Sequence, residues 1–349
     1  MSWIQQFRGS KPSVWPACGC SDILLDSMPS QNLAVELPVQ ESTGENPPSE
    51  RPIPLGTRLR IGFVRGFLVF YARCFGLSGL YRLGRFFGIL EYSCDYRRRG
   101  RVHRKLASLF GEEMSPARRR QVTRRYFMRV RCDKMFYTIM DRIPRGKLLN
   151  RIKIKNVYNV DDGLARGKGL YVALCHYGSH HVAGLMMALR GYKLAGVRDP
   201  KESHVRRYIQ QRYRETFPEV AAMKFVFASS FPRVIYRHMQ SNAIVASLLD
   251  VDRNRGENTK TCTVTFFGQE RQWLTGPVQM AVRCGATIIQ GFVVSRKNFY
   301  YQLIATPPLV DPAEAAAADE EKVVTEIVQQ YAAAVEQFVR EHPDHVMNI

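Results

Sequence analysis

Beyond Lys147 the chain alternates short apolar runs with amphipathic stretches of helical length. This alternation is typical of strand–helix units that build a mostly parallel sheet. The apolar runs predict strands at Leu170–Cys175, Lys193–Val197, Lys224–Phe227, Ala243–Leu249, Thr263–Phe267, Thr287–Val294 and Tyr301–Ala305. The amphipathic stretches predict helices at His181–Leu189, Ser203–Thr216, Phe231–Gln240, Gly276–Cys284 and Asp319–Arg340. We therefore expect an α/β fold, a three-layer αβα sandwich around a mostly parallel central sheet.

Residues 61–92 combine apolar and aromatic side chains with spaced arginines. Phe63, Phe67 and Phe70 recur at helical spacing, and arginines such as Arg65 and Arg73 interrupt them. The chain has no run of eighteen apolar residues, which argues against a conventional membrane span. The pattern predicts an amphipathic helix. Either it lies in the headgroup region of a bilayer, or its aromatic side packs into the core.

The densest charge follows directly, between Arg97 and Arg131. This stretch holds thirteen Lys or Arg and only two Glu, a net charge of +11. Ser115 followed by Pro116 marks the start of a helix within it. Such a run is either a solvated helical face or a docking surface, and the size of the imbalance favours a docking surface.

Composition divides the chain into three regions. Residues 1–56 hold eight of the eighteen prolines and a net charge of −3, which predicts a flexible Pro-rich extension. Residues 57–146 form a basic, aromatic helical region for docking to a membrane or a carrier, and residues 147–349 form the α/β core. The whole chain of 349 residues has a net charge of +20, so we expect an acidic partner such as nucleic acid, an anionic membrane, an acidic carrier protein or a phosphorylated substrate.

Cysteine usage indicates a reducing compartment. The eight cysteines have neither the even spacing of a disulfide framework nor the paired CxxC motifs of a zinc knuckle. The first twenty residues have no continuous apolar segment, so we expect no secretory signal.

The most informative stretch is the strand Leu170–Cys175, which ends abruptly in the polar sequence His176-Tyr177-Gly178-Ser179-His180-His181. In α/β sheets, ligands bind beyond the carboxyl ends of the strands. A histidine at that place can act as a general base, since its ordinary pKa lies near neutrality. Structural histidines and a metal site are the alternatives. The metal is the weaker of these, because the acid of the HExxH pattern is missing.

Segments distributed along the chain match one known pattern: Gly167-Lys168-Gly169-Leu170 leading to His176, Val197-Arg198-Asp199, Leu249-Asp250-Val251-Asp252, Phe266-Phe267-Gly268, Thr275-Gly276-Pro277 and Pro343-Asp344-His345. From about Thr57 to Ile349 the chain resembles the bacterial lipid A biosynthesis acyltransferases. These are the lauroyl and myristoyl transferases of the lysophospholipid acyltransferase superfamily. The resemblance implies a glycerolipid-acyltransferase-like core.

The resemblance also implies a mechanism. A histidine takes the proton of an acceptor hydroxyl, which attacks an acyl thioester, and an acid five residues later orients the ring in an HX4D/E motif. Here His181 occupies the position of that acid. A second imidazole brings no negative charge to the transition state, so Asp250 or Asp252 would have to supply the carboxylate from another strand end. The candidate catalytic residues are therefore His176, His181 and Asp250.

The resemblance, together with position in the predicted fold, nominates six substrate-binding residues: Arg198, Gly178, Phe267, Gly268, Thr275 and Gly276. Arg198 lies beyond a strand end, where a guanidinium can bind a phosphate or a carboxylate, or can form a surface salt bridge. Thr275 and Gly276 begin a helix whose free N–H groups can face an oxyanion or a phosphate. Simple capping of that helix by Thr275 is the alternative.

The expected function is transfer of a fatty acyl group from acyl carrier protein or acyl-CoA to a hydroxyl of a lipid acceptor, with no metal and no cofactor. We expect a peripheral protein on the cytoplasmic face of the inner membrane, which an anionic membrane surface recruits. Two other classes stay open. One is a catalytically silent member of the fold that binds lipid or carrier protein, which the replacement at His181 suggests. The other is a nucleic-acid binder, which the charge alone suggests and no recognition motif supports.

Overall fold

The computed structural model describes residues 53–198, 203–227, 231–250, 260–317 and 319–346. The chain divides at Ser49, and all the described residues belong to the unit Glu50–Ile349. The extension predicted at residues 1–56 lies outside the described residues up to residue 52.

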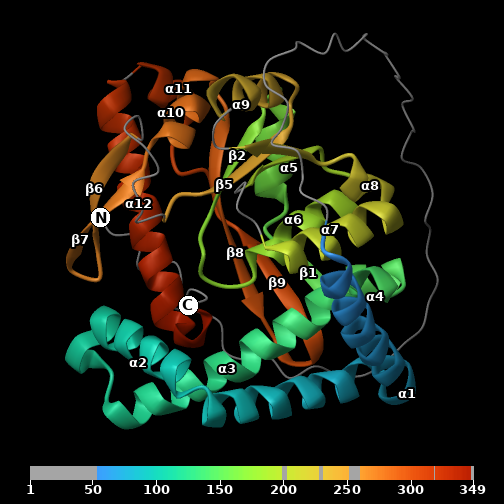
Figure 1. Cartoon of the computed structure of the whole chain (residues 1–349). Coiled ribbons are helices and arrows are strands. Elements are labelled where there is room, and N and C mark those ends of the chain that lie inside the picture. Colours follow the sequence, from blue (N-terminus) through green and yellow to red (C-terminus); the bar gives the residue numbers. More distant parts are fainter. Residues whose placement is uncertain (1–52, 199–202, 228–230, 251–259, 318, 347–349) are drawn as a thin grey trace, which may run out of the picture. The chain divides into compact units, whose positions relative to one another are not determined.

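This unit begins with four helices, and helices and strands then largely alternate from β1 to β5 (Figure 1). Its helices are α1 (Leu55–Cys94), α2 (Tyr96–Phe110), α3 (Pro116–Ile139), α4 (Arg145–Arg151), α5 (Tyr158–Ala165), α6 (His180–Leu189), α7 (His204–Thr216), α8 (Pro218–Ala221), α9 (Phe231–Gln240), α10 (Gly276–Arg283), α11 (Pro312–Ala317) and α12 (Glu320–Glu341). Its strands are β1 (Ile152–Lys155), β2 (Leu170–Leu174), β3 (Leu194–Arg198), β4 (Lys224–Phe227), β5 (Ile244–Leu248), β6 (Thr261–Phe266), β7 (Gln269–Leu274), β8 (Thr287–Ser295) and β9 (Tyr301–Ala305).

The main sheet has seven strands in the order β1-β9-β8-β2-β5-β3-β4. Every neighbouring pair is parallel except β8 and β9, which run antiparallel. Helices α6 and α7 lie on one side of the sheet, and α10 and α12 lie on the other (Figure 1). The predicted α/β sandwich with a mostly parallel sheet is therefore confirmed.

Two strands were not predicted, and one predicted strand has a different partner. The strand expected at Thr263–Phe267 is β6, which pairs with β7 in a separate antiparallel hairpin. Strand β7 is mostly polar and exposed, and β1 is a four-residue strand that alternates Ile and Lys. Neither has the apolar run of a buried parallel strand, so neither is recognisable by that pattern.

The central strands divide their side chains between two hydrophobic layers. Leu170 of β2 and Ile244 of β5 pack into the layer formed with α1, α3, α6 and α7. Tyr171 and Val245, the next residue on each strand, pack into the layer formed with α10 and α12. This alternation follows from the two-residue period of a strand. Each fully buried apolar side chain of this size contributes roughly 1.5–3 kcal/mol, so both layers hold the central strands in place.

Helix α1 has a polar interaction on its inner side and an apolar outer face. Arg65 is buried, where it forms an ion pair with Asp141 and donates to the Thr138 carbonyl at 3.2 Å. On the outer side Phe63 is 80% exposed and Phe70 is 65% exposed. Helices of soluble domains usually have the reverse distribution.

Helix α1 also bears on the expectation that the chain does not span a membrane. By length and composition it is the one helix within the described ranges that could cross a bilayer, although one such helix is weak evidence. It changes direction at Gly76, where the backbone has φ +67°. Its second half packs along α3 (Figure 1).

Helix α3 begins where the sequence predicts a start. The Ser115 side chain accepts a hydrogen bond from the Arg118 backbone N–H at 3.3 Å, and this caps α3. Some cations of the basic run are structural. Glu91 accepts from both Arg98 and Arg131, and Arg98 lies buried over aromatic rings.

Other cations of α2 and α3 face outward. Seven exposed arginines are Arg97, Arg101 and Arg104 on α2 and Arg118, Arg120, Arg124 and Arg125 on α3. The three on α2 are spaced i, i+4, i+7 and share one face. Burial and the charges of Arg119, Arg120 and Arg99 lower the pKa of His103, which indicates that both helices contribute cations to one region.

Candidate active site

The site begins where β2 and β5 end. These strands are parallel neighbours in register, with Leu174 opposite Leu248, so the residues that follow them emerge side by side. His176 and Asp250 are those residues. The Nδ1 atom of His176 lies 3.0 Å from Oδ1 of Asp250. The His176 backbone N–H donates to the same carboxylate, 2.9 Å from Oδ2 and 3.2 Å from Oδ1.

The hydrogen bonds determine which ring nitrogen is available. An ionised carboxylate only accepts hydrogen bonds, so Nδ1 of His176 carries the proton that points to Asp250. The lone pair of the neutral ring is then on Nε2, the nitrogen that can take a proton. The Asp250 side chain is 2% exposed and that of His176 is 29% exposed. The carboxylate is therefore sequestered from water, while the ring can still be reached.

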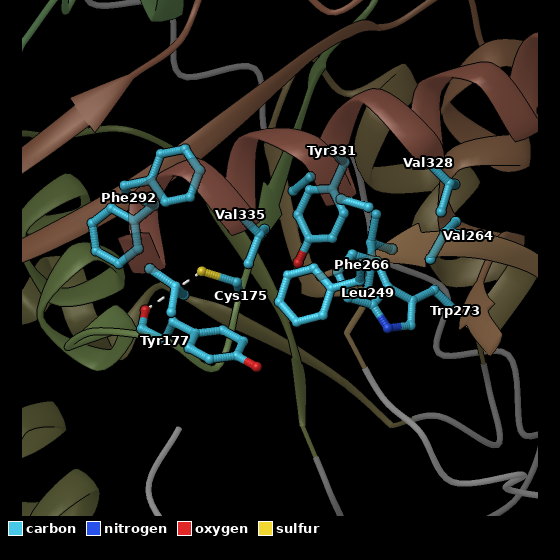
Figure 2. Close-up of a cluster of buried hydrophobic side chains, with 14 of the residues drawn as sticks. Cys175, Tyr177, Leu249, Val264, Phe266, Trp273, Phe292, Val328, Tyr331 and Val335 are labelled. Carbon is cyan, nitrogen blue, oxygen red and sulfur yellow. Dashed lines mark hydrogen bonds between the residues drawn. The ribbon is translucent and has the colours of Figure 1, made fainter. Parts of the chain in front are cut away.

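Hydrophobic side chains hold both partners in place. Cys175 and Tyr177 are buried on either side of His176, and Leu249 is buried just before Asp250. Figure 2 shows these three residues in one cluster with side chains from α12, including Tyr331. The Tyr331 hydroxyl donates to the Leu174 carbonyl at 2.7 Å, which fixes the end of β2. The His–Asp pair is thus held by a packed scaffold.

Gly178 occupies a backbone position that only glycine can fill. Its φ is +84°, and a Cβ atom there would lie 2.5 Å from the Val293 carbonyl oxygen. Its N–H donates to the His345 carbonyl at 2.9 Å. Gly178, predicted as a substrate-binding residue, therefore forms the turn that separates His176 from α6.

The structure does not bring His181 into hydrogen-bonding contact with His176. Nε2 of His181 lies 2.7 Å from a guanidinium nitrogen of Arg206, so the ring accepts from that cation. Burial, with the charges of Arg206 and His176, lowers the pKa of His181 to about 3. Burial, with the electrostatic influence of His181, His176 and Arg206, also keeps the pKa of His180 well below its usual value. Both rings are neutral at physiological pH.

Of the remaining predicted residues, Arg198, Thr275 and Gly276 have described backbone positions near this edge of the sheet. Arg198 is the last residue of β3, the neighbour of β5, and its side chain lies outside the described part of the chain. Asp199 and Asp252 are outside the described residues. Thr275 and Gly276 begin α10 directly after Leu274, whose N–H donates to the Leu249 carbonyl at 3.3 Å. The Thr275 side chain makes no capping hydrogen bond, so the capping alternative is not observed.

Phe267 and Gly268 form the two-residue turn between β6 and β7, with φ values of +52° and +68°. The Phe267 N–H donates to Glu336 Oε2 at 2.6 Å, and the Arg340 guanidinium lies 4.6 Å from its ring centroid. These contacts direct Phe267 toward α12. Its neighbour Phe266 is nearer the site, with its ring 6.2 Å from that of Tyr177.

Sequence reasoning missed Asp133, on α3. This carboxylate accepts hydrogen bonds from Ser179, Ser295, Tyr301 and Arg129. The available signal was its position as an isolated acid just after the strongly basic run. Among the described residues, no group of three or more His, Cys, Asp or Glu is arranged to hold a metal ion.

Taken together, an open α/β sheet and a carboxylate-oriented histidine at its carboxyl edge are the features expected of an acyltransferase with a histidine base. Comparison with known families agrees with this class. The model of the bacterial lipid A biosynthesis acyltransferases matches residues 56–349, and the chain belongs to that family of membrane-associated acyltransferases. The resemblance drawn from the sequence motifs is thereby confirmed. No curated protein matches the chain.

Proposed function

We propose that the protein transfers a fatty acyl group from a carrier thioester to a hydroxyl of a lipid acceptor, with His176 as the general base and Asp250 as its orienting carboxylate. The observation that carries this proposal is the contact of 3.0 Å between Nδ1 of His176 and Oδ1 of Asp250 at adjoining strand ends. Family membership supports the acyl transfer, and this contact supports the choice of residues.

The reaction needs one base and no cofactor. Nε2 of His176 takes the proton of the acceptor hydroxyl as its oxygen attacks the thioester carbonyl. The tetrahedral intermediate then collapses, the C–S bond breaks, and the imidazolium returns its proton to the leaving sulfur. Asp250 stays ionised throughout and stabilises the positive ring by hydrogen bond and charge. In this scheme Asp250 has the part that the family's motif gives to an acid at the position of His181.

The test is acyl transfer by purified protein. It is incubated with acyl carrier thioester or acyl-CoA and a bacterial lipid extract, and mass spectrometry detects lipids heavier by one acyl group. We expect transfer by the wild-type protein and loss of at least about 10³-fold with His176→Ala, by analogy with removal of a triad base. Full activity of His176→Ala would refute the proposed base. Binding of lipid or carrier without turnover would favour the catalytically silent alternative.

The proposal includes attachment to the cytoplasmic face of the inner membrane through the outer face of α1. The exposed Phe63, Phe67 and Phe70 lie on one side of the helix, while Arg65 on the opposite side is paired with Asp141 inside the protein. A helix that packs on its own domain and turns aromatic side chains outward fits the interface of a bilayer. Peripheral attachment would keep the long acyl chain close to lipid during transfer.

The proposal also assigns a role to the exposed arginines of α2 and α3, which would attract an acidic donor carrier protein. Arg124 on α3 is nine residues from Asp133, which is about 14 Å along the helix axis. Asp133 in turn contacts Ser179, three residues after His176. Nine residues are two and a half helical turns, so Arg124 points to the opposite side of α3 from Asp133, and a carrier docked there would have to deliver its donor on a flexible arm.

A further inference from the structure

The carboxylate of Asp133 accepts hydrogen bonds from four donors in four parts of the chain. Oδ2 accepts from Ser179 Oγ at 2.7 Å, from Ser295 Oγ at 2.9 Å and from Arg129 at 3.0 Å. Oδ1 accepts from the Tyr301 hydroxyl at 2.8 Å. The carboxylate side chain is 16% exposed, and these bonds join α3 to the turn before α6 and to strands β8 and β9. Hydrogen bonds to a charged group are among the stronger ones in proteins.

The hydrogen bond from Ser179 to Asp133 takes the place of a helix-capping hydrogen bond. Ser179 is at the N-terminal cap of α6, where a serine side chain usually accepts from the first N–H groups of the helix. Its side chain makes no such bond, and its hydroxyl donates to Asp133 instead. The serine therefore secures the turn to α3 at the cost of capping its own helix.

The turn is fixed along its whole length. Its first residue, His176, is held by Asp250 through the backbone N–H and Nδ1. Its third residue, Gly178, donates to the His345 carbonyl, and its fourth, Ser179, donates to Asp133. His345 is itself tied to β8, since its Nε2 accepts from the Ser295 N–H at 3.0 Å. Asp250 and Asp133 thus fix the two ends of one four-residue segment.

We infer that Asp133 is a positioning residue, which acts through Ser179 to hold the turn that presents His176 to the acceptor hydroxyl. This inference rests on the proposed function, because it needs His176 to be the base. Asp250 alone fixes Nδ1, but the direction of Nε2 also depends on the path of the backbone after His176. Small displacements of a catalytic group from its reacting partner can lower the rate by about 10²-fold.

Asp133→Asn tests the inference. The asparagine keeps the shape but presents an NH₂ group or a neutral oxygen to donors that now share one carboxylate. We expect kcat to fall about 10- to 100-fold with KM within about twofold of wild type, because the turn and not the substrate contacts is disturbed. Ser179→Ala removes the bond from the turn to Asp133, together with the contact of 3.0 Å to Ser295 Oγ, and should lower kcat in the same direction. The double variant should be no slower than Asp133→Asn, since both changes break one connection.

Asp141→Asn is the matched control. Asp141 follows the same helix and is also buried and paired with arginines, but these are Arg65 in α1 and the adjacent Arg142, and neither belongs to the turn. It should lower the thermal unfolding midpoint and leave kcat near the wild-type value. If Asp133→Asn and Ser179→Ala retain kcat to the same degree as Asp141→Asn, Asp133 is only structural and the inference is wrong. A rise in KM without a fall in kcat would also overturn it.

The outcome for His176→Ala separates this inference from the proposal on which it rests. If that variant stays active, the proposed base is wrong and the inference about Asp133 fails with it. If His176→Ala is inactive and Asp133→Asn has wild-type kcat, the base stands and only the positioning role is lost. Should Asp133→Asn fail to fold, Ser179→Ala still decides the matter, because Ser179 does not cap α6.

Discussion

At the scale of single residues, the carboxylate that contacts His176 comes from a different strand and not from the position of the family's motif acid. The family's motif has an acid five residues after its histidine, and His181 stands there in this chain. Asp250 instead approaches His176 from the end of β5. The ring receives its negative partner at Nδ1, the side away from the nitrogen that would take the proton in the proposed mechanism. Under that proposal, the change at His181 does not deprive the base of its carboxylate.

Asp250→Asn should therefore be severely impaired. An amide has no negative charge for the imidazolium, and its NH₂ can also donate to Nδ1 and so move the ring proton to Nε2. We expect kcat to fall about 10²- to 10⁴-fold with little change in KM, as in comparable triads. Steady-state kinetics of acyl transfer provide the measurement. Asp161→Asn, at an exposed aspartate that accepts from Tyr192, is the control. Near-normal turnover by Asp250→Asn would remove the carboxylate from the mechanism.

His181→Asp, which restores the family's acid, should not raise activity. The new carboxylate would lie beside Arg206, which now donates to His181, and would pair with that guanidinium. Nδ1 of His176 is already occupied by Asp250. We expect kcat within about threefold of wild type, which corresponds to roughly 0.6 kcal/mol of activation free energy. A gain of tenfold or more would mean that His181 is a weakened catalytic partner and that Asp250 does not compensate for it.

Part of this site is readable from sequence and part is not. His176 was found because an apolar strand ends in polar residues, a purely local pattern. Asp250 was one of two candidates, since β2 and β5 are neighbours in space while β3 and β4 come between them in the chain. Asp133 was missed because its bond to Ser179 joins a helix and a turn 46 residues apart. Local patterns do not contain such pairings.

At the scale of elements, α1 differs most from a helix of a soluble domain. Its ion pair between Arg65 and Asp141 faces inward and its phenylalanines face outward. The sequence predicted the helix but left two environments open for its aromatic side. The exposure of Phe63 and Phe70 shows that these rings do not pack into the core. By contrast, the short strand β1 was missed because four residues of alternating Ile and Lys are too few to establish a period.

Substitution of Phe63, Phe67 and Phe70 by Ser should weaken membrane binding. Each phenylalanine that enters the interface contributes through its buried apolar area, so removing three should lower recovery on vesicles at least tenfold. Flotation with vesicles of phosphatidylethanolamine and phosphatidylglycerol measures this. Tyr158→Ser and Tyr236→Ser remove exposed aromatic residues from other elements and should leave recovery unchanged. If the triple variant floats like these controls, α1 is not the attachment surface.

The arginines of α2 allow a separate test of donor recruitment. Arg101→Glu with Arg104→Glu reverses two charges on the exposed face and should raise KM for the carrier-bound donor about tenfold or more with kcat nearly unchanged. Added salt should raise the KM of the wild-type protein for the carrier-bound donor toward that of the variant, because salt screens exposed charges. Arg212→Glu makes the same charge reversal on another helix, α7, and is the control that should leave this KM unchanged. Equal KM values for wild type and double variant would exclude this face as the docking surface.

At the scale of the whole molecule, buried imidazoles make the fold sensitive to acid. Burial is the main cause that lowers the pKa values of His180, His181 and His345, three residues from α6 and from the C-terminal turn. In the unfolded chain histidine has a pKa of about 6.5, so the unfolded state binds more protons than the folded state below that pH. The contribution of these histidines to the free energy of unfolding is therefore complete above about pH 6.5. It decreases as the pH falls toward their pKa values in the folded protein.

His181→Gln should reduce this sensitivity. The pKa of His181 is about 3 in the folded protein, so between pH 6 and pH 4 its contribution is uptake of close to one proton on unfolding. Glutamine does not titrate, and its amide oxygen can still accept from Arg206. Chemical denaturation at a series of pH values gives the free energy of unfolding as a function of pH. The slope of this curve should correspond to nearly one proton fewer for the variant than for the wild type. His204→Gln, at an exposed histidine, controls for loss of an imidazole as such. If both variants keep the wild-type slope, His181 is protonated in the folded protein and the neutral ring beside Arg206 is wrong.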